Sequence, residues 1–207
     1  MVSKLQQAVI DGDLETSLQE VRDYLGQNVL PQTIMEEHLI PAMAEVGRLF
    51  EENEYFVPEL LISARAMQES MKILNPLLSG SGIQKVGRVV IGTVKGDFHD
   101  IGKNLVAAML EGGGFEVVDL GVDVSAEKFA ESVKEKPKSI VAMSALLTTT
   151  MTQMKSIIEK LESDGLRQSI KIIVGGAPVT EEFAKQIGAD GYSANASSAV
   201  TLAKSLV

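Results

Sequence analysis

The spacing of apolar residues divides the chain into two parts whose character changes near residue 80. Before that point, apolar side chains recur every three or four positions, as they do on one face of a helix: Leu5, Val9, Leu14, Leu18, Val21 and Leu25. After it, short apolar runs alternate with helical patterns. The chain is therefore predicted to contain a helical part followed by an alternating strand–helix part.

The helical part is predicted to hold four helices, the smallest number that closes a bundle. Pro31 suits the start of the third helix, because a proline is well tolerated in a first helical turn. Pro41 is expected to bend this helix and not to end it. Pro58 is expected to open the fourth helix, which ends near Leu74.

A segment rich in Pro, Gly and Ser, NPLLSGSGIQKVG at residues 75–87, indicates a linker between the two parts. We therefore place a helical cap domain at residues 1–78, a linker at 79–87 and an α/β domain at 88–207.

The second part alternates predicted strands with predicted helices. The strands are expected at Arg88–Thr93, Phe115–Leu120, Ser139–Ser144, Ile170–Val174 and Gly191–Ser193. The helices are expected at Ile101–Glu111, Ala126–Lys134, Thr149–Ser163, Glu181–Ile187 and Ala196–Leu206. This alternation predicts an α/β fold with a five-stranded, parallel, doubly wound sheet of the flavodoxin-like or Rossmann-like kind.

Composition and charge exclude several classes of function. Hydrophobic residues make up 45% of the chain and aromatic residues only 4%, so the core must be aliphatic. A net charge of −9 argues against a nucleic-acid partner. The chain has no cysteine, which removes disulfides, Cys-ligated zinc, iron–sulfur clusters and Cys nucleophiles. With neither a signal peptide nor an apolar run of about 20 residues, a cytoplasmic protein without a membrane partner is expected.

Polar and small residues follow the predicted strands. In open parallel sheets, ligands bind at the carboxyl ends of the strands, where the strand order reverses. The first strand is followed by Gly96, Asp97, Phe98, His99 and Asp100. The third and fourth strands lead into Ser144, Thr148, Thr149, Thr150, Gly175 and Gly176. Glycines and hydroxyls at these positions indicate a slot for a slender, polar ligand.

His99, one of two histidines in the chain, has three interpretations. It is a loop histidine bonded to an aspartate, or a base oriented by Asp97 for a hydroxyl nucleophile in a hydrolase. In the third interpretation, it is one axial ligand of a metal whose other positions a macrocycle fills, and Asp97 fixes the imidazole tautomer. No dinucleotide fingerprint or P-loop follows the first strand. The residues alone leave all three interpretations open.

Three short motifs carry a family resemblance. Asp97-x-His99-x-x-Gly102, Ser144-x-Leu146 and Gly175-Gly176 resemble, in order and spacing, the cobalamin-binding signature of corrinoid proteins in methyltransferase systems. The segment VGRLFEENEYFVPELLISARAM, residues 46–67, is similar to the helical cap that precedes this domain in methionine synthase and in small corrinoid proteins. The resemblance covers nearly the whole chain.

The resemblance implies a role for each motif residue. His99 would replace the cofactor's own base as the lower axial ligand of cobalt, Asp97 would hydrogen-bond its other nitrogen, and Thr150 would extend this relay. The displaced nucleotide tail of the cofactor would lie along Gly102, Ser144, Leu146, Thr148, Gly175, Gly176 and Ala196. The rest of the turn, namely Gly96, Phe98 and Asp100, is expected to belong to the same cofactor site.

The resemblance also implies a function, that of a methyl carrier with cobalamin, as methylcobalamin or a related corrinoid, for its cofactor. A substrate-specific methyltransferase would load it, and an acceptor methyltransferase would unload it to tetrahydrofolate or a thiol. A reductive activase is a third expected partner. The chain would catalyse no turnover alone, and residues 50–67 would shield the upper face of the corrin. The alternatives are a cobalamin-dependent sensor or regulator and the unrelated hydrolase.

Overall fold

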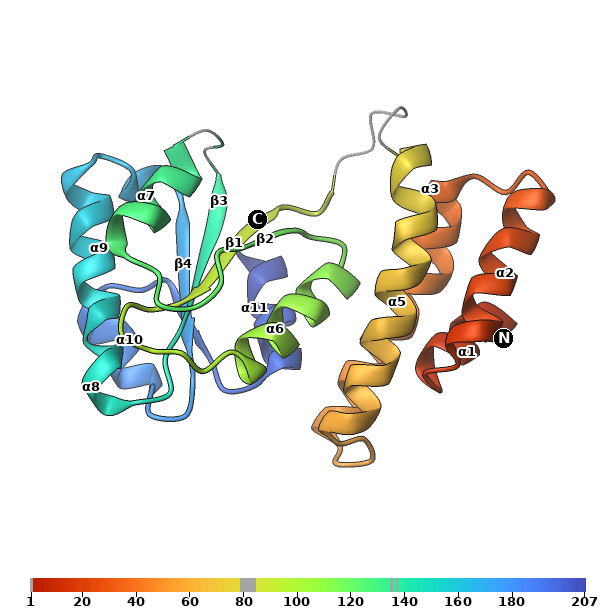
Figure 1. Ribbon diagram of the computed structural model, residues 1–207, viewed down its shortest axis with the longest axis horizontal. Coiled ribbons are helices and arrows are strands. Elements are labelled where there is room, and N and C mark those ends of the chain that lie inside the picture. The colour runs from red at the N-terminus through yellow and green to blue at the C-terminus, as the bar shows by residue number, and fades with distance from the viewer. Residues whose placement is uncertain (1, 79–84, 135, 137) are drawn as a thin grey trace. The chain divides into compact units, whose positions relative to one another are not determined.

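The computed structural model describes residues 2–78, 85–134, 136 and 138–207, and its chain forms two compact units (Figure 1). The first comprises Met1–Lys85 with Glu111–Gly114, and the second comprises Val86–Leu110 with Phe115–Val207. Residues 79–84 of the predicted linker lie outside the described residues. The domain boundaries at 78 and 88 therefore stay a prediction.

The first unit is helical. Its α-helices are α1 (Lys4–Ile10), α2 (Leu14–Gly26), α3 (Pro31–Ile34), α4 (Ile40–Glu51) and α5 (Val57–Leu78). Side-chain caps begin the first two, because Ser3 Oγ accepts from the Gln6 amide and Asp13 Oδ1 from the Thr16 amide. The apolar positions of the sequence pattern lie in the core of this unit, among them Leu5, Val9, Val21, Leu39, Val46, Leu60 and Met67.

A π-helical segment, Met35–Leu39, joins α3 to α4 just before Pro41. The Ile40 amide donates to the Met35 carbonyl, five residues earlier, instead of four as in an α-helix. Proline has no amide hydrogen, and its ring crowds the preceding turn of a regular helix, so a widened turn accommodates it. The third predicted helix therefore continues past Pro41, as expected.

Helix α5 runs further than the sequence pattern predicts. Residues 75–78 are helical and carry Pro76 inside the helix, so the prediction that this helix ends near Leu74 is wrong. Pro76 lies within the last turn, where its missing amide removes a single hydrogen bond near the helix end. No helix in the described ranges is long and apolar enough to span a membrane.

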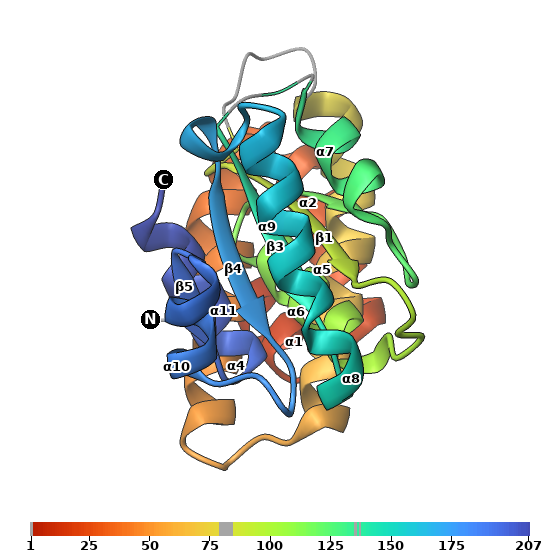
Figure 2. The same cartoon turned by 90° about the vertical axis from the view of Figure 1, so that its left-hand side faces the viewer.

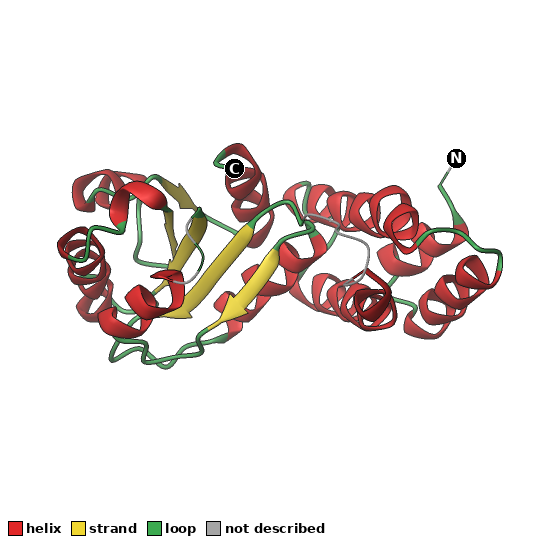
Figure 3. Cartoon of the chain, turned by 90° about the horizontal axis from the view of Figure 1, so that it is seen from above, coloured by secondary structure: helices red, strands yellow, loops and turns green. Residues whose placement is uncertain are grey.

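The second unit holds a parallel sheet of β1 (Arg88–Thr93), β2 (Glu116–Asp119), β3 (Ser139–Ser144), β4 (Lys171–Gly175) and β5 (Gly191–Ser193). Among the described residues, the strand order is β2-β1-β3-β4-β5. Figure 3 shows the strands in yellow with helices around them. The order reverses between β1 and β3, so the predicted α/β fold of flavodoxin-like order is confirmed.

Helices cover both faces of this sheet: α6 (Ile101–Gly112), α7 (Ala126–Lys134), α8 (Thr148–Met151), α9 (Gln153–Ser163), α10 (Glu181–Ile187) and α11 (Ala196–Ser205). Helices α7 and α9 lie on one face, and α6 and α11 on the other (Figures 1 and 2). Val90 and Val141 pack in the core of the first face, and Val89 and Ile140 in that of the second. This alternation makes the strands apolar on both sides.

The helix predicted at Thr149–Ser163 is divided in two at Thr152. The Thr152 hydroxyl donates to the Thr149 carbonyl at 3.1 Å. Such a side-chain bond competes with the backbone pattern of a helix, which accounts for the interruption. The short α8 places Thr150 beside the end of β3.

Candidate cofactor-binding site

The candidate site lies where β1 and β3 end, at the reversal of strand order. Thr93 and Ser144 are paired at the carboxyl ends of these strands, and the Val94 amide donates to the Ser144 carbonyl at 3.0 Å. Two turns therefore leave the sheet side by side. The first carries the D-x-H motif, and the second carries residues 145–147 and leads into α8.

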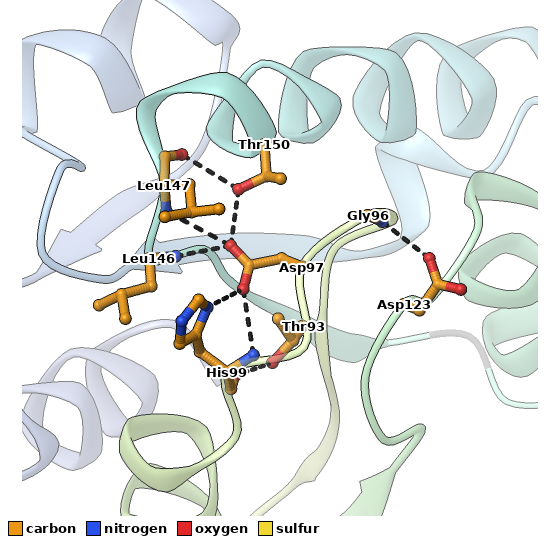
Figure 4. A network of polar contacts seen from close by, with 8 residues as sticks. All are labelled: Thr93, Gly96, Asp97, His99, Asp123, Leu146, Leu147 and Thr150. Carbon is orange, nitrogen blue, oxygen red and sulfur yellow. Dashed lines mark hydrogen bonds and ion pairs between the residues drawn. The ribbon is translucent and has the colours of Figure 1, made fainter.

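The Asp97 carboxylate connects the two turns and is completely buried. Its Oδ2 accepts hydrogen bonds from the Thr150 hydroxyl at 2.6 Å and from the Leu146 amide at 2.8 Å (Figure 4). The Leu147 amide approaches the same oxygen at 3.4 Å. One oxygen of Asp97 is thus held entirely by groups that follow β3.

The other carboxylate oxygen holds His99. Oδ1 of Asp97 accepts from the His99 amide at 3.1 Å and lies 2.7 Å from Nδ1 of the imidazole. An ionised carboxylate can only accept, so Nδ1 carries the proton and the lone pair of the neutral ring lies on Nε2. Half of the His99 side chain is exposed. The geometry therefore presents Nε2 as a nitrogen ligand.

The contacts of Asp97 also fix its charge. Burial alone would raise the pKa of this carboxyl group, but the hydrogen bonds from Thr150, Leu146 and His99 outweigh burial and hold the pKa well below its ordinary value. Asp97 is consequently ionised at neutral pH. An ionised partner makes the imidazole a more basic ligand than a free one.

Large apolar side chains are exposed around His99. Phe98 is 68% exposed and Ile101 75%, while Leu146 and Leu147 are 44% and 43% exposed. Exposed apolar residues gathered around one polar group mark a binding surface more often than ordinary solvent-facing surface does. The set suits a flat ligand with apolar surface above the imidazole.

The surroundings of the predicted glycines differ, so glycine is needed at these positions for two different reasons. A Cβ on Gly176, whose φ is +123°, would lie 1.9 Å from the Ala145 carbonyl oxygen, and one on Gly175 would lie 2.9 Å from the Ser193 oxygen. These two glycines allow neighbouring backbone segments to pack closely. A Cβ on Gly102 would meet no atom within 4 Å. Only Gly102 among these three therefore borders open space.

The remaining predicted residues are spread around the same edge. Ser144 is half-buried at the end of β3, Thr148 is exposed at the start of α8, and Ala196 is buried at the start of α11. Asp100 is exposed and accepts from the side-chain amide of Asn104 at 3.2 Å. The structure thus brings His99 and Thr150 into contact with Asp97. In the described part of the chain, the side chains of Ser144, Thr148, Ala196 and Asp100 form no hydrogen bond with these three residues.

The described residues include no group of three or more His, Asp or Glu side chains that could hold a metal ion. His99 would accordingly offer one ligand, and a metal bound here would bring its other ligands with it. In the cap, the stretch predicted to shield the corrin includes four exposed apolar side chains, Phe56, Val57, Leu61 and Ile62.

Several groups near the motif were missed by the sequence analysis. The amides of Leu146 and Leu147 bond Asp97, and Thr93 and Asp123 bond the turn itself. Lys103 is buried, and its Nζ contacts Asp119 and Asn104. The lysine directly after the D-x-H-x-x-G motif was visible in the sequence, although its burial was not. Main-chain donors leave no trace in side-chain patterns.

Comparison with known proteins identifies the family of this fold and site. A family model described as B12 binding domain matches residues 87–201, and a second with the same description matches residues 1–75. The chain belongs to the B12-binding family of corrinoid proteins. Dimethylamine corrinoid protein 1 of Methanosarcina acetivorans is 42% identical over 208 residues, which cover 100% of this chain and 97% of the relative.

Solved structures agree with this assignment. A cobalamin-binding protein from Desulfitobacterium hafniense is 34% identical, with a TM-score of 0.81 over 98% of this chain and 97% of its own. A chain of the methanol:cobalamin methyltransferase complex from Methanosarcina barkeri is 33% identical, with a TM-score of 0.87 over 98% of this chain and 78% of its own. The resemblance drawn from the three motifs is confirmed, and cobalamin is the cofactor of this corrinoid protein.

Proposed function

We propose that this corrinoid protein carries a methyl group between two methyltransferases and binds cobalamin with His99 as the lower axial ligand in place of the cofactor's own base. The observation that carries the proposal is the bond between His99 Nδ1 and the buried Asp97 carboxylate, 2.7 Å long. This bond reserves Nε2 of a half-exposed imidazole for a metal.

When bound, cobalamin supplies the methyl-transfer chemistry at its cobalt, while the protein supplies binding, orientation and tuning. Neutral imidazole is a good ligand for a first-row transition metal. Asp97 holds a proton on Nδ1 of His99, and Thr150 and Leu146 hold the carboxylate in place. The imidazole is therefore oriented, and its tautomer selected, by the chain itself.

The open space beside Gly102 supports a path for the displaced nucleotide tail, because a Cβ at this position would meet no atom within 4 Å apart from its chain neighbours and its own helix backbone. The proposed slot also includes Ser144 and Thr148, whose hydroxyls can bond a long polar group. Phe98 and Ile101, both largely exposed, would cover apolar surface of the corrin ring near His99.

Donor specificity would lie in the partner enzyme and not in this chain. The relative from M. acetivorans is named for dimethylamine, and the M. barkeri complex is named for methanol, although both match nearly all of this chain. We propose a substrate-specific methyltransferase as the loading partner and a second methyltransferase, acting on tetrahydrofolate or a thiol, as the unloading partner. A reductive activase would restore the carrier, and all of these proteins would meet in the cytoplasm.

Cofactor binding provides the first test. Apoprotein incubated with hydroxocobalamin and separated by gel filtration should retain the cofactor and give the visible spectrum of histidine-ligated cobalamin. A protein that elutes colourless would overturn the proposal.

Methyl transfer provides the second test. Protein loaded with methylcobalamin should lose its methyl group when an acceptor methyltransferase and its thiol or tetrahydrofolate are added, and it should be stable without them. A loaded protein that no acceptor methyltransferase can demethylate would contradict a carrier role while leaving cobalamin binding intact.

A further inference from the structure

The turn that carries His99 is held from a second side by Thr93, a residue to which the motif assigns no role. Thr93 is completely buried at the end of β1, and its hydroxyl donates to the His99 carbonyl at 2.9 Å (Figure 4). Asp97 already holds the His99 amide and Nδ1. The main chain of His99 is therefore fixed on both sides of its Cα atom.

The other end of the turn is held by Asp123, which lies in the loop between β2 and α7. Its Oδ1 accepts from the Gly96 amide at 2.7 Å (Figure 4). Its own amide donates to the Asp97 carbonyl at 3.0 Å. Asp123 has a φ of +53°, a left-handed conformation that few residues other than glycine adopt. This conformation lets main chain and side chain of one residue bond the same turn.

Main-chain bonds join these two contacts into one unit. The Thr93 amide donates to the Gly121 carbonyl at 3.0 Å, and the Val124 amide donates to the Thr93 carbonyl at 3.0 Å. Val94 and Val124 form an additional parallel bridge. Thr93 and residues 121–124 thus form a continuous hydrogen-bonded frame along one side of the D-x-H turn.

A frame of this kind adds something that the Asp97–His99 bond cannot supply. Asp97 and His99 are two residues apart on the same turn, so their mutual bond is unchanged if the turn moves as a body relative to the sheet. Oδ2 of Asp97 ties the turn only to the residues after β3. Bonds from Thr93 and Asp123 to the main chain restrain the turn from the side of β1 and of the β2–α7 loop. A metal ligand is effective only when its nitrogen is held in direction as well as in tautomer.

We propose that Thr93 and Asp123 are positioning residues that fix the direction of the His99 imidazole before the cofactor binds. The inference rests on the proposed function, since it concerns the residue offered there as the cobalt ligand. It predicts a preformed ligand in the apoprotein, with both residues acting through the main chain of the turn.

Matched pairs of variants distinguish the loss of each hydrogen bond from other effects of changing the side chain. Thr93→Val keeps the shape and removes the hydroxyl, whereas Thr93→Ser keeps the hydroxyl. Asp123→Gly tolerates the positive φ and removes the carboxylate, whereas Asp123→Asn keeps an acceptor oxygen. Lys138→Gly is the control, because Lys138 also has a positive φ, of 69°, and lies in the loop before β3.

Two measurements apply to this set, and the first needs no cofactor. In the apoprotein, the Nδ1–H signal of His99 in ¹H–¹⁵N NMR spectra should exchange with water faster in Thr93→Val and Asp123→Gly than in the wild type. After loading with hydroxocobalamin, the ratio of histidine-ligated to histidine-free cofactor, measured from the visible spectrum, should fall about fivefold in each of these two variants. This is the effect of losing one net hydrogen bond. Thr93→Ser, Asp123→Asn and Lys138→Gly should match the wild type.

The inference is overturned if Thr93→Val and Asp123→Gly keep the wild-type ratio and exchange rate, whatever happens to their thermal stability. It is also overturned if the fraction of histidine-ligated cofactor falls as far in Thr93→Ser and Asp123→Asn as in Thr93→Val and Asp123→Gly. A wild-type protein that binds no cobalamin would refute the proposed function alone, since the imidazole exchange rate would still decide whether the two residues fix His99.

Discussion

Replacing Asp97 by asparagine changes one buried oxygen into an NH₂ group and leaves the shape of the side chain unchanged. Every contact of this carboxylate is with a donor, so the new group must oppose some of them. If the NH₂ group replaces Oδ2, it faces the amide donors of Leu146 and Leu147 and leaves both without an acceptor. If it replaces Oδ1, it faces only one amide donor, that of His99, and the imidazole can change tautomer to accept from it.

The second orientation is therefore expected in Asp97→Asn, and it reverses the tautomer of His99. The asparagine NH₂ donates to Nδ1, which must give up its proton, and the proton then lies on Nε2. A protonated Nε2 has no lone pair for a metal. To bind cobalt, the ring must return to the wild-type tautomer and lose its bond to residue 97.

The magnitude follows from these contacts. The His99 amide, 3.1 Å from Oδ1 in the wild type, loses its acceptor, which costs about 1 kcal/mol of unfolding free energy for this part-buried donor. Loss of the partner that orients a metal-binding histidine lowers metal affinity by about 10–100-fold. We expect cobalamin affinity in Asp97→Asn to fall within that range.

Titration with hydroxocobalamin, followed by visible spectra, measures this affinity and the fraction of histidine-ligated cofactor. ¹⁵N NMR of the apoprotein reports the tautomer directly. Asp164→Asn is a suitable control, because it removes the same charge from a residue that bonds Lys160 at the end of α9. The reasoning is refuted if Asp97→Asn binds cobalamin with wild-type affinity and spectrum, or if its apoprotein keeps the proton on Nδ1.

His99→Gly should still bind cobalamin through the tail slot but lose the histidine-ligated visible spectrum. Gly102→Ala should raise the unfolding free energy measured in urea by up to about 1 kcal/mol, because alanine suits a helix, yet weaken cobalamin binding about tenfold by narrowing the slot. Gly176→Ala should lower the unfolding free energy by about 1–3 kcal/mol, since its Cβ would lie 1.9 Å from a carbonyl oxygen. Because the pKa of Asp97 is lowered on folding, its stabilising effect is present above about pH 4 and lost below it. The stability difference between wild type and Asp97→Asn in urea should therefore narrow from pH 6 to pH 3.

Each of these outcomes has a clear opposite. An unchanged spectrum in His99→Gly would remove the axial assignment. Wild-type cobalamin affinity in Gly102→Ala would mean that the tail does not pass this residue, and a stable Gly176→Ala would mean that the close backbone approach is dispensable. A stability difference that stays constant with pH would show that Asp97 has the same pKa in the folded and unfolded chain.

The sequence predicts the strands well where burial decides them. The bounds of Arg88–Thr93 and Ser139–Ser144 are confirmed as predicted, because apolar runs buried on both faces leave a strong signal. The bounds of the short, half-buried Gly191–Ser193 are also confirmed. Helix ends were less predictable. Residues 75–78 stay helical despite Pro76, and the Thr152 hydroxyl interrupts the predicted helix.

The side chains of the site were predictable because their motif is local, whereas their supports were not. Asp97 and His99 are two residues apart, and a motif can encode such a spacing. The contacts of Thr93 and Asp123 arise when the β2–α7 loop reaches the end of β1, which depends on the folded sheet. The amides of Leu146 and Leu147 are common to every sequence, so only coordinates reveal them.

The contacts of Asp97 also determine when the site around His99 can be completed during translation. The bond from Asp97 to the Leu146 amide spans 49 residues, and that to Thr150 spans 53. A nascent chain that has not yet released β3 and α8 therefore holds Asp97 without the donors that make its burial favourable. The donors that hold Oδ2 of Asp97 are therefore in place only after β1 and β3 have paired, so we expect the complete site to form after the sheet.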